Sequence, residues 1–121
     1  MNNKAAIGLR GEELATAYLR DNGYMICHRN WRNGRYEIDI VATKYGITHI
    51  VEVRTRRAGA LVSPEMSINS NKATSLRRAA AAYLAQTRTQ GDVAFDLIAV
   101  DIFPDNSSDV RFIENVIEFG W

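Results

Sequence analysis

The sequence has few residues that could cross-link it or hold it in a membrane. Cys27 is its single cysteine, which excludes an intrachain disulfide and any metal site built from several cysteines. No apolar run approaches the roughly 20 residues that cross a bilayer, and residues 1–7 lack the apolar centre of a signal peptide. We therefore expect a cytoplasmic protein without a membrane segment.

Lysine is also scarce, with three residues against twelve arginines, and the net charge is only +1. Any basic surface must therefore be local. Guanidinium groups suit bidentate contacts with phosphate better than ammonium groups do, although a GC-rich genome would produce the same excess of arginine. The 46% hydrophobic and 24% charged content is ordinary for a globular protein. We expect one domain that spans residues 1–121.

Residues 37–56 predict a β-hairpin, because two alternating, β-branched strands flank a turn at Tyr45-Gly46. A two-residue loop would place Lys44 opposite Ile47, and the resulting register sets apolar residues against apolar residues. The predicted pairs are Val41 with Ile50, Ile40 with Val51, Asp39 with Glu52, Ile38 with Val53, and Glu37 with Arg54.

This register makes Asp39 and Glu52 cross-strand neighbours with Cβ atoms roughly 4.5–5.5 Å apart, an arrangement that like charges disfavour. A shared proton, a neighbouring cation or a bound metal could offset the repulsion. Carboxylate oxygens are ligands that Mg²⁺ or Mn²⁺ prefers. The alternative is the polar face of an ordinary solvated hairpin, in which Glu37 and Arg54 form a routine ion pair.

The rest of the chain predicts an α/β sandwich around a mixed sheet, in the order α-β-β-β-α-β-β. Since the strand over 93–103 follows a helix, a right-handed crossover into parallel pairing is expected. Asn33-Gly34 indicates another hairpin, which would pair Trp31 with Tyr36, Arg29 with Ile38, and Cys27 with Ile40. We expect helices over 5–22 and 70–87, strands over 24–31, 93–103 and 110–118, and a loop over 56–69.

Charged residues outside the central hairpin could reach the two carboxylates or a substrate. Glu12 lies at the rim of the apolar stripe of the first helix, where an early-turn glutamate also interacts favourably with the helix dipole. Lys72 projects onto the apolar face of the second helix, as a snorkelling or a functional side chain. Arg56 and Arg57 begin the predicted loop, where they would be solvated or would contact phosphate.

Several short motifs follow one another along the chain, namely Gly11-Glu12, Gly23-Tyr24, Arg29-Asn30-Trp31-Arg32, Glu37-Ile38-Asp39-Ile40-Val41-Ala42, Val51-Glu52-Val53-Arg54-Thr55-Arg56, Lys72 and Phe95-Asp96. In this order they resemble the YraN family of uncharacterised bacterial proteins, predicted endonucleases that are similar to archaeal Holliday-junction resolvases. The resemblance spans nearly the whole chain. It implies a restriction-endonuclease-like fold, with an α-β-β-β-α-β core, and a PD-(D/E)xK nuclease site.

The resemblance implies roles for four acidic residues. Asp39 and Glu52 would be the metal-binding carboxylates, Glu12 would be the helix-borne acid that completes the site, and Glu37 would be an adjacent acid. Phe95-Asp96 matches a family motif, which we interpret as structural support.

The chain departs from the family pattern at two positions. Tyr36 stands where glycine is common, which would crowd the strand locally. Arg54 stands where the motif has lysine, and an arginine side chain cannot act as a general base because it does not lose its proton. Arg54 could stabilise charge in the transition state or pair with Glu37, and Lys72 could stand in for the missing lysine.

The leading hypothesis is divalent-metal-dependent hydrolysis of DNA phosphodiesters, with Mg²⁺ or Mn²⁺ held by Asp39 and Glu52 and by the Val53 carbonyl as a further candidate. Symmetric cleavage of a four-way junction would require a homodimer, and monomer and dimer are both open. One rival is a catalytically attenuated nucleic-acid-binding module on the same fold. Another is a protein-interaction domain in which the carboxylates are incidental. The residues expected to contact nucleic acid are Arg54, Arg56, Arg57 and Lys72.

Overall fold

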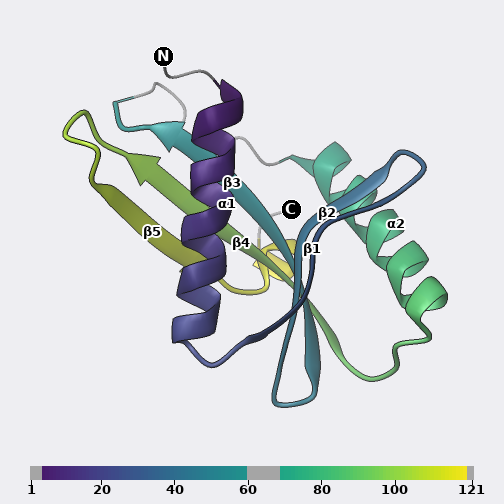
Figure 1. The fold of residues 1–121 in the computed structure, drawn as a ribbon. Helices are drawn as coiled ribbons and strands as arrows, with labels where there is room; N and C mark the ends of the chain where they lie inside the picture. The colour runs from purple at the N-terminus through teal and green to yellow at the C-terminus, as the bar shows by residue number, and fades with distance from the viewer. Residues whose placement is uncertain (1–3, 60–68, 120–121) are drawn as a thin grey trace.

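Two long helices cover opposite faces of a five-stranded mixed sheet (Figure 1). The computed structural model describes residues 4–59 and 69–119, so most of the predicted loop, residues 60–68, lies outside the described residues. The strand order is β1-β2-β3-β4-β5. In chain order the elements are α1 (Lys4–Asp21), β1 (Met25–Asn33), β2 (Tyr36–Lys44), β3 (Ile47–Arg57), α2 (Ser70–Thr87), β4 (Val93–Ile102), β5 (Ser108–Ile113) and α3 (Val116–Phe119).

This arrangement confirms the predicted α/β fold and its α-β-β-β-α-β core. Strands β3 and β4 pair in parallel, as expected for strands joined through the helix α2, and the other neighbouring strands are antiparallel. The central hairpin also has the predicted loop. Lys44 pairs with Ile47, and the loop residues Tyr45 and Gly46 have φ angles of 52° and 78°, as a two-residue type I′ turn requires.

The register predicted for the first hairpin is wrong by two residues. Asn33 pairs with Tyr36 across the turn, and Trp31 consequently pairs with Ile38 rather than with Tyr36. Gly34 is therefore the first residue of the loop, and its φ of 62° supplies the conformation that a glycine-first hairpin turn needs. The other two predicted pairs are also wrong: Arg29 pairs with Ile40, and the register shifts between Ile26 and His28, on either side of Cys27.

Two predicted boundaries are wrong as well. Strand β3 continues through Arg56 and Arg57, because its parallel ladder with β4 extends to the pair Arg57–Ile102. These arginines therefore belong to a strand and not to a loop. The last strand ends at Ile113, not at residue 118. Asn115 adopts a φ of 53° and its N–H donates to Asp96 Oδ1 at 3.0 Å, and the short helix α3 begins at the next residue.

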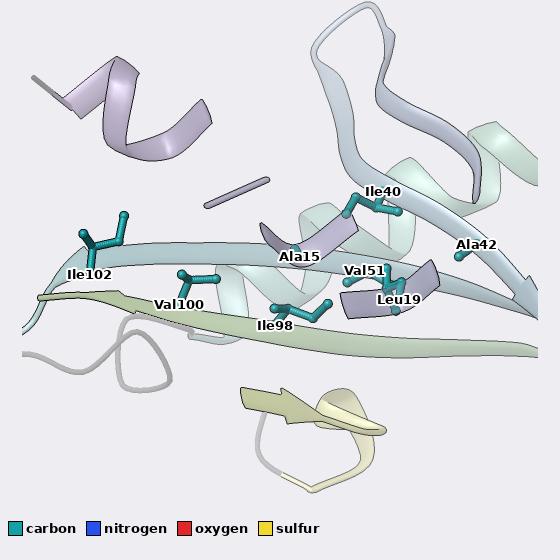
Figure 2. Close-up of a cluster of buried hydrophobic side chains, with 8 residues drawn as sticks. All are labelled: Ala15, Leu19, Ile40, Ala42, Val51, Ile98, Val100 and Ile102. Atoms are coloured by element: carbon teal, nitrogen blue, oxygen red, sulfur yellow. The ribbon is translucent and has the colours of Figure 1, made fainter. Parts of the chain in front are cut away.

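The sheet separates two apolar clusters. Figure 2 shows the cluster beneath α1, in which Ala15 and Leu19 meet side chains of β2, β3 and β4. The cluster beneath α2 includes Leu76 and Tyr83 from the helix. Each buried leucine contributes roughly 1.5–3 kcal/mol relative to an exposed one, so both helices are held by the apolar stripes that the sequence predicts. In the described part of the chain, no helix combines the length and the apolar composition needed to span a bilayer.

Strand β2 changes the face that it presents between Ile38 and Ile40. Both side chains are fully buried, but Ile40 packs in the α1 cluster and Ile38 in the α2 cluster. Residues two apart in a regular strand share a face, so the strand is twisted here. Asn30, in the adjoining part of β1, has a φ of 52°. Asp39 lies at the change of face.

Beyond this point β2 and β3 separate. Their ladder ends at the pair Ile40–Val51, after which β2 continues beside β1 while β3 continues beside β4. In Figure 1 the β1–β2 hairpin turns toward α2, whereas β3 runs beneath α1. The two strands therefore form a fork in the interior of the sheet, and Asp39 and Glu52 stand at its base.

Candidate active site

The base of the fork brings Asp39 of β2 close to β3. Asp39 Oδ2 accepts a hydrogen bond of 2.8 Å from the backbone N–H of Val53, where a regular ladder would continue between the two backbones. The predicted ladder pairs Asp39–Glu52, Ile38–Val53 and Glu37–Arg54 are therefore wrong as backbone pairs. The carboxyl groups of Asp39 and Glu52 nevertheless lie close together, since each is among the influences on the pKa of the other.

The environment of these two carboxyl groups disfavours full ionisation. Burial, followed by the charge of Asp39, raises the pKa of Glu52 to about 7. Burial also raises the pKa of Asp39, although the Val53 N–H and the hydrogen bond with Glu52 oppose this effect. The pair therefore retains a proton more readily than ordinary carboxylates do, as expected of like charges held together out of water.

Two cations approach Glu52 from its own side of the sheet. Lys72 Nζ, from the first turn of α2, lies 3.3 Å from Glu52 Oε2, and Arg54 Nε lies 2.9 Å from the same oxygen. The Arg54 N–H does not point at the carboxylate, so this buried nitrogen makes no hydrogen bond within the described residues. The ion pair between Glu37 and Arg54, considered as an alternative, does not form among the described residues, since Glu37 instead lies 3.6 Å from Arg32 Nη2.

A cleft of about 700 Å³ opens at the fork on the side of α1. Glu12, from the first half of α1, lines it, and burial followed by the charge of Asp39 raises the pKa of Glu12. The structure thus brings Glu12 to the same cleft as Asp39. The predicted site residues that line this cleft are Glu12, Glu37, Asp39, Arg54, Arg56 and Arg57.

Lys72 and Glu52 are not among the residues that line this cleft. Lys72 instead lines a second cavity, of about 320 Å³, between α2 and the β1–β2 hairpin. Glu37 lines both cavities, so the fork is open on both sides. Side chains from the two helices reach the carboxylate pair from opposite faces of the sheet.

The two arginines at the end of β3 have different surroundings. Arg56 Nε lies 2.6 Å from Asp101 Oδ1, and Arg111 Nη1 lies 2.8 Å from Asp101 Oδ2. Although burial raises the pKa of Asp101, the hydrogen bonds from both arginines outweigh it and lower the pKa. Arg57 is exposed and forms no ion pair with any residue that the structure describes. Arg57 is therefore the better placed of the two to contact a ligand.

Two features of the site were missed in the sequence. Asn30 lines the cleft and hydrogen-bonds the side chain of Glu12. The available signal was the residue type, since asparagine tolerates a positive φ better than most residues, and Asn30 has a φ of 52°. Gly11 lies directly against Thr55, where a Cβ on Gly11 would stand 2.8 Å from Thr55 Cβ. The absence of a side chain at Gly11 lets α1 approach β3 closely enough to bring Glu12 to the cleft.

Asp96, predicted to give structural support, lies apart from the cleft. It is 1% exposed, contacts His49 Nδ1 at 2.5 Å through Oδ2 and accepts the Asn115 N–H through Oδ1. Both carboxylate oxygens of Asp96 are therefore engaged with the protein, which favours its interpretation as structural support.

Known proteins are similar in sequence to most of this chain. A family model described as uncharacterised protein family UPF0102 matches residues 11–100, which include every predicted site residue. A UPF0102 protein of Bacteroides thetaiotaomicron is 44% identical over 94 residues, 78% of each chain. Similar proteins of the same name occur in Chloroherpeton thalassium, with 34% identity over 95% of each chain, and in Syntrophomonas wolfei, with 38% identity over 90% of this chain and 95% of the relative.

Proposed function

The chain belongs to the UPF0102 family, and we propose that this member is a divalent-metal-dependent nuclease that hydrolyses DNA phosphodiester bonds. The single observation that carries the proposal is the convergence of Asp39 and Glu52 at the base of a fork between two interior strands. Holding two carboxylates together costs folding free energy, because each carboxylate raises the pKa of a neighbouring one. A cation that binds between them while the protein functions would explain why the pair is present.

The residues present fit Mg²⁺ or Mn²⁺. No group of three or more histidine, cysteine, aspartate or glutamate side chains in residues 4–59 and 69–119 is arranged to hold a metal. Mg²⁺ does not need such a group, because it keeps several waters and commonly binds through one or two carboxylates and substrate phosphate. Asp39 and Glu52 would hold the ion, which would supply an activated water and neutralise charge on the scissile phosphate.

The other residues of the cleft serve the substrate. Glu12, from α1, lines the cleft, where it can orient a water or a hydrated ion, and Glu37 lines the same cleft as a further acid. Arg54 contributes positive charge next to Glu52, where it can stabilise the charge that develops on phosphate oxygens. Arg57 is available to contact the nucleic-acid backbone, which gives binding that is independent of sequence and sensitive to salt.

The second candidate is a nucleic-acid-binding module on the same fold with little or no catalysis. One observation favours it: Lys72 and Arg54 both lie within 3.3 Å of Glu52 Oε2. These side chains already neutralise Glu52 and would compete with a divalent cation. A protein with this ion-pair cluster would bind the phosphate backbone without cleaving it.

Cleavage assays with purified protein separate the two candidates. Branched, duplex and single-stranded DNA are incubated with Mg²⁺ or Mn²⁺, together with the variants Asp39→Asn and Glu52→Gln. A nuclease cleaves at least one substrate, and both variants lose cleavage while Glu114→Gln, which alters an exposed acid outside the cleft, retains it. Salt-dependent binding without cleavage supports the binding module, and cleavage that persists in both variants removes the catalytic assignment. The assay with four-way junctions, run beside a measurement of oligomeric state, tests whether a homodimer acts.

A further inference from the structure

A smaller cavity, of about 240 Å³, adjoins the acidic cleft at the amino-terminal end of α1. It lies between α1, the end of β3 and the turn after β4. Ile7 and Arg57 line both this cavity and the acidic cleft. The two hollows are therefore neighbours that meet at these side chains, so a strand bound in the cleft would lie next to the smaller cavity.

The walls of this cavity are fixed by hydrogen bonds. Arg10 Nη1, from α1, donates to Asn106 Oδ1 at 2.6 Å, and Arg10 Nη2 donates to the backbone oxygen of Asn106. The turn itself is closed by a hydrogen bond of 2.9 Å from Phe103 N–H to the Ser107 oxygen. The guanidinium of Arg10 is thus occupied in tying the turn to the helix, and the cavity exists before any ligand binds.

Two side chains of the cavity remain available to a ligand. Phe103 lines it and is 39% exposed, so its ring is open to a ligand. Arg57 lines it from the other side and forms no ion pair with the described residues. An exposed aromatic ring beside an unpaired guanidinium is the combination that binds single-stranded nucleic acid, since the ring stacks on a base and the cation contacts phosphate.

We propose that this cavity binds one unpaired nucleotide of the substrate strand, with its base stacked on Phe103 and its phosphate against Arg57. The volume is below the roughly 300–1,000 Å³ of pockets for drug-sized ligands and suits one base rather than a base pair. This inference rests on the proposed nucleic-acid substrate and narrows it. The preferred DNA has a single-stranded segment next to the position that lies in the acidic cleft, as at a splayed end or a branch with an unpaired arm.

The test compares a short fluorescent duplex that carries a single-stranded extension with the same duplex made blunt. Affinities are measured by fluorescence anisotropy in EDTA, so that cleavage plays no part. We expect the wild-type protein to prefer the extended duplex. Phe103→Ala should weaken binding of the extended duplex about 5- to 150-fold, the equivalent of one stacked base, and leave binding of the blunt duplex unchanged.

Matched controls use residues of the same type elsewhere. Tyr45→Ala removes an aromatic ring that is 91% exposed at the tip of the β2–β3 hairpin, and it should leave both affinities unchanged. Arg57→Ala should reduce the slope of the logarithm of the binding constant against the logarithm of salt concentration by about one. Arg20→Ala, in the last turn of α1, should leave this slope unchanged. Phe103→Leu keeps an apolar side chain and removes the stacking ring, so it should match Phe103→Ala with an unchanged melting temperature.

Specific outcomes overturn the inference. It fails if the wild-type protein shows no preference for the extension, if Phe103→Ala and Phe103→Leu bind both duplexes as tightly as the wild type, or if Tyr45→Ala loses as much affinity as they do. Cleavage of DNA by a protein without this preference would leave the proposed nuclease function intact while removing the nucleotide site. Extension-dependent binding that requires Phe103, in a protein that cleaves nothing, would support the site and remove the nuclease.

Discussion

The backbone N–H of Val53 donates a hydrogen bond of 2.8 Å to the carboxylate of Asp39 at the point where β2 and β3 separate. An acidic side chain therefore replaces a backbone carbonyl as the partner of an interior strand. The bond fixes one carboxylate of the pair relative to the strand that carries Glu52. Local backbone structure and the acidic site thus depend on the same residue.

Substitutions of Asp39 should separate its two roles. Asp39→Ala leaves the Val53 N–H without its acceptor, so we expect the free energy of unfolding to fall by about 1–3 kcal/mol. Asp39→Asn keeps an oxygen that can accept this bond and removes a charge beside Glu52, so its stability at pH 8 should equal or exceed that of the wild type. Urea denaturation measures both, and cleavage should be lost in both. Equal destabilisation of the two variants would show that the bond to Val53 contributes little.

Stability without metal should decrease as pH rises through the titration of Glu52. In the folded protein the pKa of Glu52 is raised from 4.5 to about 7, chiefly by burial and then by Asp39, so the folded state binds the proton more tightly than the unfolded state. The stabilisation is fully present below about pH 4.5 and is lost as pH rises through about 7. Each pKa unit corresponds to about 1.4 kcal/mol, so urea denaturation in EDTA should reveal a loss of a few kcal/mol.

Variants identify the group responsible for this pH dependence. Glu52→Gln should remove most of the decrease, whereas Glu114→Gln should retain it. Lys72→Met should extend the decrease to higher pH, because the nearby ammonium of Lys72 lowers the pKa of Glu52. Added Mg²⁺ should stabilise the wild type more at pH 8 than at pH 5, since it binds the ionised pair. A wild-type profile that is flat from pH 5 to pH 8 would contradict the assignment.

The parts of the fold that follow from local pattern could be predicted from the sequence. The register of the β2–β3 hairpin was predicted from its turn to the pair Ile40–Val51, because a slip of one residue would set Glu52 against an isoleucine. Helix α2 was predicted with its observed bounds. The YraN family, which is the UPF0102 family, was predicted from ordered motifs, and the comparisons confirm that the chain belongs to it. Lys72 was predicted to lie on the apolar face of α2, as a snorkelling or a functional side chain, and the structure places it beside Glu52.

The fork could not be predicted, because it depends on groups that are far apart in the sequence. Periodicity assumes that alternate side chains of a strand point to the same face of the sheet. Here the twist near Asn30 and the hydrogen bond from the Val53 N–H to Asp39 place Ile38 in the cluster beneath α2. Likewise, Arg56 was expected in a loop because Gly59, Ser63 and Pro64 follow it, and nothing nearby in the sequence reveals its partner. Asp101 lies 45 residues away, and only the parallel register of β3 and β4 brings the two together.

Replacing Arg54 by lysine tests whether the site is an attenuated enzyme. Arg54 occupies the motif position of lysine, and its Nε lies 2.9 Å from Glu52 Oε2. A lysine can exchange a proton, which arginine cannot do, so Arg54→Lys should increase the initial rate of cleavage. The upper limit is about 10²–10⁴-fold, the usual contribution of general acid–base catalysis. Arg57→Lys is the matched control and should not raise the rate. A protein that binds DNA but cleaves none in either form is a binding module.

The close approach of α1 to β3 should make Gly11 intolerant of a side chain. A Cβ there would overlap Thr55 Oγ1 and stand 2.8 Å from Thr55 Cβ, so Gly11→Ala should destabilise the fold by about 1–3 kcal/mol. It should also reduce cleavage, because Glu12 shifts with the helix. Gly8→Ala is the control on the same helix, where a Cβ meets nothing within 4 Å, and it should stabilise the protein by about 0.5–1 kcal/mol.

A double-mutant cycle assigns this effect to the contact itself. Thr55→Ala removes the two Thr55 atoms beyond Cβ that an added methyl group would strike, so Gly11→Ala should cost less in the Thr55→Ala background than in the wild type. Because the residues touch, an interaction energy of about 0.5–3 kcal/mol is expected. If instead the two substitutions add without coupling, the loss in Gly11→Ala arises elsewhere, and the placement of Glu12 does not depend on this close approach.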